Sequence, residues 1–258
     1  MKMRPLVIAA ALALGACTTM LPPPSGPVIP AFLMAAVSDV ARPAADRERD
    51  AARRPADVLA FAGLTPGMKV ADLVPGGGYF TRIFSKAVGP GGHVYAYVPD
   101  ELTKMAKRPP AVNAIAAEVG YSNVSVIVKP LPQFGAPEKL DLVWTSQNYH
   151  DMHADFMGPV NIAAVNSAVF RALKPGGVYV VLDHADDIGR GIADVNTLHR
   201  IDPSVVRQEV EAAGFIYEGE STLLRNPADN HSLAVFDPTV RGHTDQFIYK
   251  FRKPRGAR

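Results

Sequence analysis

Short apolar runs alternate along most of the chain with longer segments in which apolar residues recur every three or four positions. Five runs predict buried strands, at 70–74, 94–98, 124–128, 140–144 and 178–182. The spaced pattern predicts four helices. The first begins at Pro55, the second spans 79–88, and the fourth begins at Pro203 behind the cap Asp202. The third buries Ile162, Val165, Val169 and Leu173. Strands that are apolar on both faces need cover on both sides, so this order predicts an α/β fold with a mainly parallel sheet between two layers of helices.

The last part of the chain breaks this alternation. Two further strands are predicted at 215–217 and 246–251, joined by a long loop without a helical pattern. A parallel connection needs a crossover, usually a helix, so these two strands are expected to form an antiparallel hairpin at one edge of the sheet. The region from 44 to 258 has a length that suits one domain.

The first residues predict export. Lys2 and Arg4 precede an apolar run over 6–14, and small residues close the run. The run is too short to span a bilayer, and this order of basic, apolar and small residues is typical of a secretory signal. Residues 1–16 are therefore expected to be a signal peptide.

The motif LGAC, which ends at Cys17, resembles the bacterial lipoprotein box. The resemblance implies that Cys17 is lipidated and anchors the protein to a membrane, with 17–43 as a proline-rich tether. Thr18 rather than an acidic residue follows, which favours the outer membrane. We therefore expect a periplasm-facing lipoprotein of the cell envelope, and an ordinary cleaved signal is the alternative.

Charge and cysteine content narrow the range of functions. Without Lys2 and Arg4, the 27 lysines and arginines fall to 25, which equals the 25 aspartates and glutamates. A neutral mature chain argues against a nucleic-acid partner. Cys17 is the only cysteine, which excludes an internal disulfide and a cysteine metal site. Five arginines over 42–54 alternate with acidic residues and are expected to form a solvated helix face. No protein partner is evident.

A glycine-rich loop is the strongest motif. In VADLVPGGGYFT, from Val70 to Thr81, a strand runs into Gly76, Gly77 and Gly78 and then directly into a helix. Glycines let the main chain approach a ligand closely, and the start of a helix offers free N–H groups. The motif therefore predicts a ligand site, and a tight turn without a ligand is the alternative.

This loop is similar to that of class I S-adenosylmethionine-dependent methyltransferases. Asp72, Gly76 and Gly78 match the family's acidic residue and alternating glycines, and Val74 stands where the first glycine is usual. A group of bacterial predicted methyltransferases has the same loop and a late LKPGG turn, and the resemblance covers 45–254. It implies a Rossmann-like methyltransferase fold with a seven-stranded sheet, S-adenosylmethionine as cofactor, and methyl transfer to an oxygen or nitrogen of a small-molecule substrate.

The same resemblance implies the cofactor contacts, namely Asp72, Gly76, Gly77, Gly78, Tyr79, Tyr97, Asp100 and Gln147. Such sites carry an acidic residue at the end of the second strand, where it holds the ribose hydroxyls. That place falls here on Val98. Asp100 or Glu101 is expected to replace it if Pro99 bends the chain toward the crevice, and otherwise the ribose contact is absent.

Polar residues cluster after the fourth and fifth predicted strands. Gln147, His150 and Asp151 follow the fourth, and Asp183 and His184 end the fifth. Adjacent parallel strands lie about 5 Å apart, so the two clusters should face one crevice. A histidine beside a carboxylate suits proton removal near neutral pH. We predict His150 as the catalytic base, oriented by Asp151 or Asp183, with His184 in the same catalytic cluster; the alternative is that they bond loop backbone.

Two other functions fit the same residues. His150 and His153 with Asp183 or His184 offer nitrogen and oxygen ligands for a zinc-like ion, which predicts a metal-assisted hydrolase. Alternatively, the chain retains the fold as a non-catalytic envelope protein that binds another ligand, which Val74 and Val98 favour.

Overall fold

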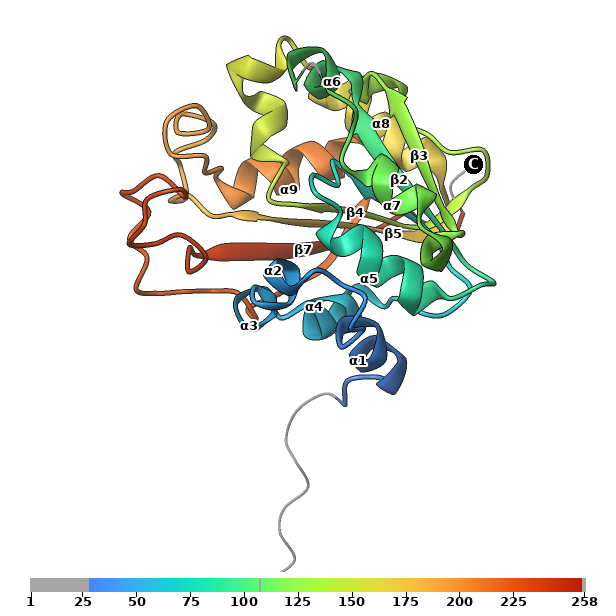
Figure 1. Ribbon diagram of the computed structural model, residues 1–258. Helices are drawn as coiled ribbons and strands as arrows, with labels where there is room; N and C mark the ends of the chain where they lie inside the picture. Colours follow the sequence, from blue (N-terminus) through green and yellow to red (C-terminus); the bar gives the residue numbers. More distant parts are fainter. Residues whose placement is uncertain (1–27, 107, 257–258) are drawn as a thin grey trace, which may run out of the picture.

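The computed structural model describes residues 28–106 and 108–256, and their centre is a seven-stranded sheet in the order β3-β2-β1-β4-β5-β7-β6 (Figure 1). The first five strands run parallel, and β7 is antiparallel to both β5 and β6. The strands are β1 (Lys69–Leu73), β2 (His93–Pro99), β3 (Val124–Lys129), β4 (Leu140–Ser146), β5 (Leu173–His184), β6 (Ile216–Ser221) and β7 (Gln246–Arg252).

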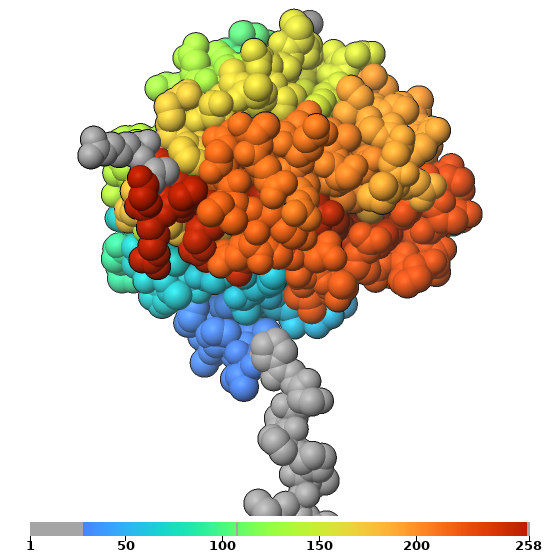
Figure 2. Space-filling view, turned by 180° about the vertical axis from the view of Figure 1, so that it is seen from behind, coloured from blue at the N-terminus to red at the C-terminus, as the bar shows by residue number. Residues whose placement is uncertain are grey.

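Helices cover both faces of this sheet. They are α1 (Ala31–Val37), α2 (Ala44–Arg47), α3 (Asp50–Arg53), α4 (Pro55–Ala62), α5 (Tyr79–Val88), α6 (Asp100–Ala106), α7 (Val112–Ala117), α8 (Ile162–Ala172) and α9 (Pro203–Ala212), with 3-10 turns at 119–121, 131–133, 150–153 and 155–157. In Figure 1, α8 and α9 lie above the sheet, and α1, α4 and α5 lie below it. Seen from behind in Figure 2, the first described residues lie at the lower end of the molecule, in blue.

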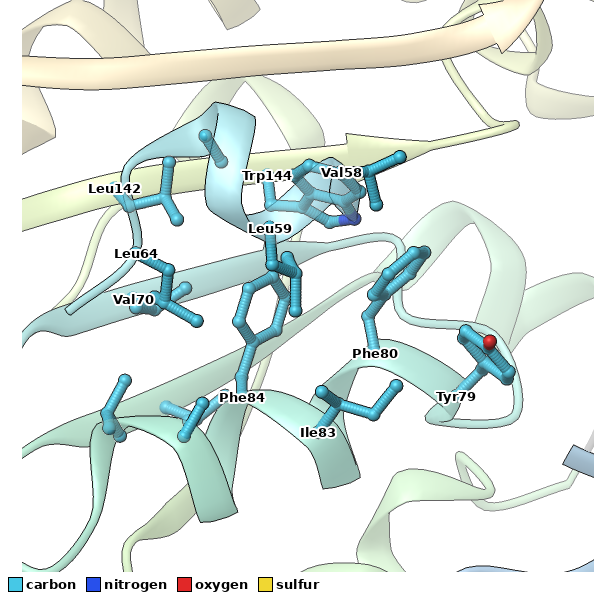
Figure 3. Close-up of a cluster of buried hydrophobic side chains, with 14 of the residues drawn as sticks. Val58, Leu59, Leu64, Val70, Tyr79, Phe80, Ile83, Phe84, Leu142 and Trp144 are labelled. Atoms are coloured by element: carbon cyan, nitrogen blue, oxygen red, sulfur yellow. The ribbon is translucent and has the colours of Figure 1, made fainter. Parts of the chain in front are cut away.

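Alternate residues of the strands supply two separate hydrophobic cores, one on each face. On the lower face Trp144 of β4 is fully buried, with its ring centroid 4.8 Å from that of Phe80 and 5.9 Å from that of Phe84 (Figure 3). On the upper face Tyr179 and Val181 of β5 pack with residues of α8 and α9. Burial on both faces explains why the parallel strands read as continuous apolar runs.

The order of the strands places a crevice at one end of the sheet. The chain moves from β1 outward to β2 and β3, and then crosses back to β4 on the other side of β1. Leu73 of β1 pairs with both Tyr97 and Thr145, so the carboxyl ends of the central strands meet at one edge. Ligands of such sheets bind outside this edge, at the switch in strand order.

The predicted fold class is confirmed, including the seven strands and the antiparallel edge. The predicted boundary at the LKPGG turn was wrong. α8 ends at Ala172, and β5 already begins at Leu173 rather than Val178. Leu173 pairs with Leu140, and the Gly176 N–H donates to the Lys253 carbonyl at 2.9 Å, so the turn residues join the sheet.

Residues before 44, the predicted start of the folded domain, also pack against it. α1 packs against α4 and α5, with Leu33 completely buried. Arg42, 1% exposed, forms an ion pair with Asp50 at 2.7 Å. The predicted signal peptide, Cys17 and the first part of the predicted tether lie outside the described residues. Within the described part of the chain, every helix is too short or too polar to cross a membrane.

Candidate functional site

Three cavities follow one another along the carboxyl edge of the sheet. The apolar cavity, of about 480 Å³, is lined by Val98, Pro99, Leu102 and Arg108 among others. The central cavity, of about 200 Å³, is lined by Asp72, Tyr79, Ser146 and Asn148. The outer cavity, of about 470 Å³, is lined by His184, Phe236, Arg241 and Gln246. Gly76 and Gly77 line the first two, while Arg49, Arg53 and Gln147 line the last two, so the cavities are neighbours.

The three consecutive glycines have different roles. A Cβ atom added to Gly76 or Gly77 would meet no atom within 4 Å, so their main chain borders open space. A Cβ on Gly78 would lie 2.1 Å from Cδ1 of Ile115. Gly78, at φ 85°, therefore allows α7 to pack against the loop, and it does not line the cavities, contrary to its predicted cofactor contact.

Two residues at the strand ends, neither of them glycine, adopt a positive backbone φ angle, which usually requires glycine. Val74 follows β1 with φ 61°, and Gln147 follows β4 with φ 61°. Hydrogen bonds hold Val74 in place: its N–H donates to the Tyr97 carbonyl at 3.0 Å, and its carbonyl accepts from Asn148 Nδ2 at 3.0 Å. Backbone strain of this kind is concentrated at ligand sites. Val74 thus takes the conformation expected of the glycine that it replaces.

Two of the predicted cofactor residues lie elsewhere. The Tyr97 side chain is completely buried in the upper core, and its hydroxyl donates to the Pro130 carbonyl at 2.7 Å. Asp100 begins α6, forms an ion pair with Lys104 at 3.0 Å and does not line the apolar cavity. Glu101 accepts from the Leu131 N–H at 3.3 Å. Val98 lines the cavity instead, and no carboxylate of the described residues joins it there.

Asp72 and Tyr79 do lie at the central cavity. Asp72 is 3% exposed and accepts a hydrogen bond from the Thr81 hydroxyl at 2.6 Å. Burial raises the pKa of Asp72 from 3.8 to about 6, although the Thr81 hydrogen bond and the charge of Arg53 oppose the change. Tyr79 donates through its hydroxyl to Asp50 at 2.6 Å.

Arginines near the amino terminus, which the sequence predicted as a solvated face, surround Tyr79. The guanidinium carbons of Arg42, Arg49 and Arg53 lie 5.2, 4.9 and 4.4 Å from the centre of the Tyr79 ring. Arg53 also donates to the Ser146 hydroxyl at 3.0 Å, and burial lowers the pKa of its guanidinium to about 10. Only the four-residue spacing of Arg49 and Arg53 indicated a shared face.

The predicted pairing of His150 with aspartates is present. His150 Nδ1 lies 2.8 Å from Asp183 Oδ1, and His150 Nε2 lies 3.1 Å from Asp151 Oδ1. Burial would lower the pKa of His150, but the charge of Asp183 and hydrogen bonds to both aspartates raise it to about 10. Since both ring nitrogens donate to carboxylates, His150 has no free nitrogen to act as the base that the sequence predicted.

His184 contrasts with its neighbour. The centre of its ring lies 5.8 Å from that of His150, and its Nδ1 lies 2.8 Å from the Thr244 hydroxyl. Burial lowers the pKa of His184 to about 3, despite the opposing charge of Asp183. Within 28–106 and 108–256, Nε2 of His184 has no hydrogen-bond partner, and the residue lines the outer cavity. The neutral imidazole at the crevice is therefore His184.

Of the predicted metal ligands, His150 lies beside Asp183 and near His184, but His153 does not join them. His153 Nε2 lies 3.1 Å from Glu209 Oε2, away from Asp183. His199, which was not predicted as a site residue, lies beside His150 and Asp151 instead. His199 stands 48 positions after Asp151 in the chain, in a segment without a periodic pattern, so no local signal indicated the contact.

Comparison with known proteins gives the fold and a distant relationship. No protein-family model matches the chain. The ubiquinone/menaquinone biosynthesis C-methyltransferase UbiE of Shewanella sediminis is 28% identical over 166 residues, which cover 61% of each chain. The matched region of the chain thus spans about three fifths of this relative's length.

Solved structures share the architecture. A SAM-dependent methyltransferase from Aquifex aeolicus has a TM-score of 0.53 and 18% identity, over 76% of this chain and 88% of its own. The Burkholderia thailandensis 1,6-didemethyltoxoflavin-N1-methyltransferase, with bound 1,6-didemethyltoxoflavin and S-adenosylhomocysteine, has a TM-score of 0.51 and 19% identity, over 82% of this chain and 79% of its own. The described residues therefore have the Rossmann-like methyltransferase fold.

Proposed function

We propose that this protein is an S-adenosylmethionine-dependent methyltransferase that acts on a small molecule. The observation that carries the proposal is the open space beside Gly76 and Gly77, between two cavities at the switch in strand order. The distant C-methyltransferase relative and the structural neighbour that holds S-adenosylhomocysteine support the same activity.

The residues along the crevice fit the parts of this cofactor. Val98, Leu102 and neighbouring prolines give the apolar cavity walls that suit a flat purine. In the central cavity, the guanidinium of Arg53 suits the carboxylate of the amino-acid end, and Asp72 suits its ammonium group. When bound, the cofactor supplies a methyl group already activated by a sulfonium. The one departure is Val98, which offers no oxygen to ribose.

The residues of the outer cavity would orient the acceptor. Gln147 and Arg53 line both the central and the outer cavities, so an acceptor in the outer cavity would lie next to the cofactor. Nε2 of His184 would accept a hydrogen bond from an acceptor hydroxyl or amine and so orient it, while Thr244 fixes the ring through Nδ1. With its pKa lowered to about 3, this imidazole is too weak a base to hold the proton itself. In this proposal His184 orients the acceptor, and His150 with Asp183 supports it from behind. A carbon acceptor, as in the distant relatives, is the alternative that product analysis would distinguish.

Calorimetric titration of the full chain with S-adenosylmethionine tests this proposal. Gly77→Leu should abolish binding without unfolding the protein, because the new side chain would enter the cavities and meets no atom within 4 Å at Cβ. Gly91→Leu is the matched control, since Gly91 also has no neighbour within 4 Å but lies in the turn before β2. The proposal fails if the wild type does not bind at millimolar cofactor, or if Gly77→Leu binds as tightly as the control.

The absence of a carboxylate from the described lining of the apolar cavity also favours a second function, a non-catalytic ligand-binding protein with the same fold. Loss of the ribose contact would weaken the cofactor site. Incubation with labelled S-adenosylmethionine and a small-molecule extract separates the two functions. Methylated product supports the enzyme, whereas binding without turnover supports the binding protein.

We further propose that the protein is a lipoprotein of the cell envelope, facing the periplasm. Support comes from the sequence alone: the basic start, the apolar run and the LGAC motif that ends at Cys17. In a bacterial host, the wild type should fractionate with membranes and incorporate labelled fatty acid. Cys17→Ser should do neither, and equal labelling of both proteins would contradict the proposal.

A further inference from the structure

Three side chains beside the outer cavity present atoms that bind metals. The Nε2 atom of His150 lies 3.1 Å from Asp151 Oδ1, and the Nδ1 atom of His199 lies 3.8 Å from the same oxygen. The three ligand atoms all lie within 4.8 Å of one another. Around a tetrahedral zinc ion with bonds of about 2.0–2.2 Å, neighbouring ligand atoms are separated by about 3.3–3.6 Å. Small side-chain movements would therefore complete a site.

His150 is oriented as metal-binding histidines commonly are. Its Nδ1 faces Asp183 Oδ1 at 2.8 Å, and its Nε2 faces Asp151 within the cluster. Asp183 is fully buried and also accepts the backbone N–H groups of His150 and His184, each at 2.8 Å, so its position is fixed. A carboxylate behind a ligating imidazole sets the ring orientation and makes the free nitrogen a better donor to the metal.

His199 gives an independent indication of a ligand. Its Nδ1 is buried and has no hydrogen-bond partner among the residues that the structure describes. The residue adopts φ 56°, a conformation that few residues other than glycine take. Its ring packs against Phe236, with 4.8 Å between centroids, and lies 5.6 Å from that of His150. An unpaired buried nitrogen on a strained backbone costs stability, and a bound ion would offset that cost.

We propose that His150, Asp151 and His199 bind a divalent transition-metal ion, with zinc as the first candidate. Two imidazoles and one carboxylate match catalytic zinc sites, which keep a further position open for water or substrate. On binding, the ion would displace the Nε2 proton of His150 to solvent and replace the hydrogen bond between His150 and Asp151. Phe236, which packs on His199, and His184 both line the outer cavity, so the open position would serve a ligand at that end of the crevice. The site does not depend on the proposed methyl transfer.

Metal titration of the untagged full chain, after removal of metal with a chelator, tests the proposal. Zinc should bind at one ion per chain by calorimetry, and cobalt should give the visible absorption of a low-symmetry site. His199→Ala and Asp151→Asn should each weaken zinc binding at least about 100-fold, because one of three ligands is lost. Asp183→Asn should weaken it about 10- to 100-fold, as removal of a supporting carboxylate does.

His153→Ala is the matched control, since His153 belongs to the same 3-10 turn as His150 but contacts Glu209. It should bind zinc as the wild type does. No stoichiometric binding by the wild type, an unchanged affinity in both His199→Ala and Asp151→Asn, or an equal loss in His153→Ala would each overturn the proposal. Circular dichroism of the chelated variants checks folding, and cofactor titration of the same samples reports on the methyltransferase proposal separately.

Discussion

The two ends of the crevice are constructed differently. Around Gly76 and Gly77 the surface is mainly backbone, formed where β1 turns into α5. Beside the outer cavity it consists of side chains held by other side chains from distant segments, such as His150 by Asp183 and His184 by Thr244. A backbone site is blocked by added bulk, whereas a side-chain site fails when one polar group is removed. Substitutions should therefore separate cofactor binding from turnover.

Removal of His184 should have the largest effect, and only at the outer end. His184→Gln should lower the rate of S-adenosylhomocysteine formation about 10²-fold, the usual cost of a misplaced acceptor. Cofactor affinity should not change, because His184 lines neither the apolar nor the central cavity. His153→Gln is the control and should keep both properties. A parallel loss of affinity and rate would show that the two ends of the crevice are not separable.

Asp72 should reveal a conflict between stability and binding at the central cavity. Because burial raises its pKa from 3.8 to about 6, the folded chain holds this proton more tightly than the unfolded chain. Its ionisation therefore reduces stability as pH rises from about 4 to about 6, and the penalty persists above that range. Asp72→Asn should raise the unfolding free energy at pH 7 by about 2–3 kcal/mol and flatten its pH dependence.

Denaturant unfolding at several pH values measures this effect, and calorimetry should show weaker cofactor binding in the same variant. Asp57→Asn is the control, because Asp57 forms only a partly exposed ion pair with Arg54. If Asp72→Asn is less stable than the wild type at pH 7, the ionised carboxylate contributes more through Thr81 and Arg53 than its burial costs.

Val98 should decide whether the apolar cavity receives the ribose. Val98→Asp places a carboxylate on the cavity wall, where it can accept hydrogen bonds from ribose hydroxyls, and we expect about tenfold tighter cofactor binding. Val98→Leu has no acceptor and should bind no more tightly than the wild type. Calorimetry measures both. Equal affinities for the aspartate and leucine variants would place the ribose elsewhere.

The smallest expected effect concerns the strain at Val74. At φ 61° glycine is favoured over alanine, so Val74→Gly should be more stable than Val74→Ala by about 1 kcal/mol. At Val98, in the extended strand β2, the order should be reversed, with alanine the more stable. Thermal unfolding of the four variants checks the comparison. The same order at both positions would mean that Val74 is not strained.

The spacing of apolar residues predicted most of the strands and helices, because this spacing is a property of residues that are close together in the chain. The runs at 70–74 and 140–144 are apolar whichever strand lies beside them, and both became central strands. The predicted start of β5 was wrong because the true start depends on a contact with Lys253, some 80 residues later. Tyr97 was predicted as a cofactor contact, but its side chain is buried in the upper core, where its hydroxyl donates to the carbonyl of Pro130.

Patterns within short stretches of the chain were enough to predict the succession of strands and helices, the glycine-rich loop, and the two clusters that end β4 and β5. Each of these is written in consecutive residues, where local backbone preference and burial act together. The chemistry of the clusters, by contrast, depends on how the chain folds. It brought His199 to His150, placed Arg53 at the crevice, and left His184 neutral while His150 gained two carboxylate partners. These properties arise from distances between remote side chains and from their burial, which no local pattern encodes.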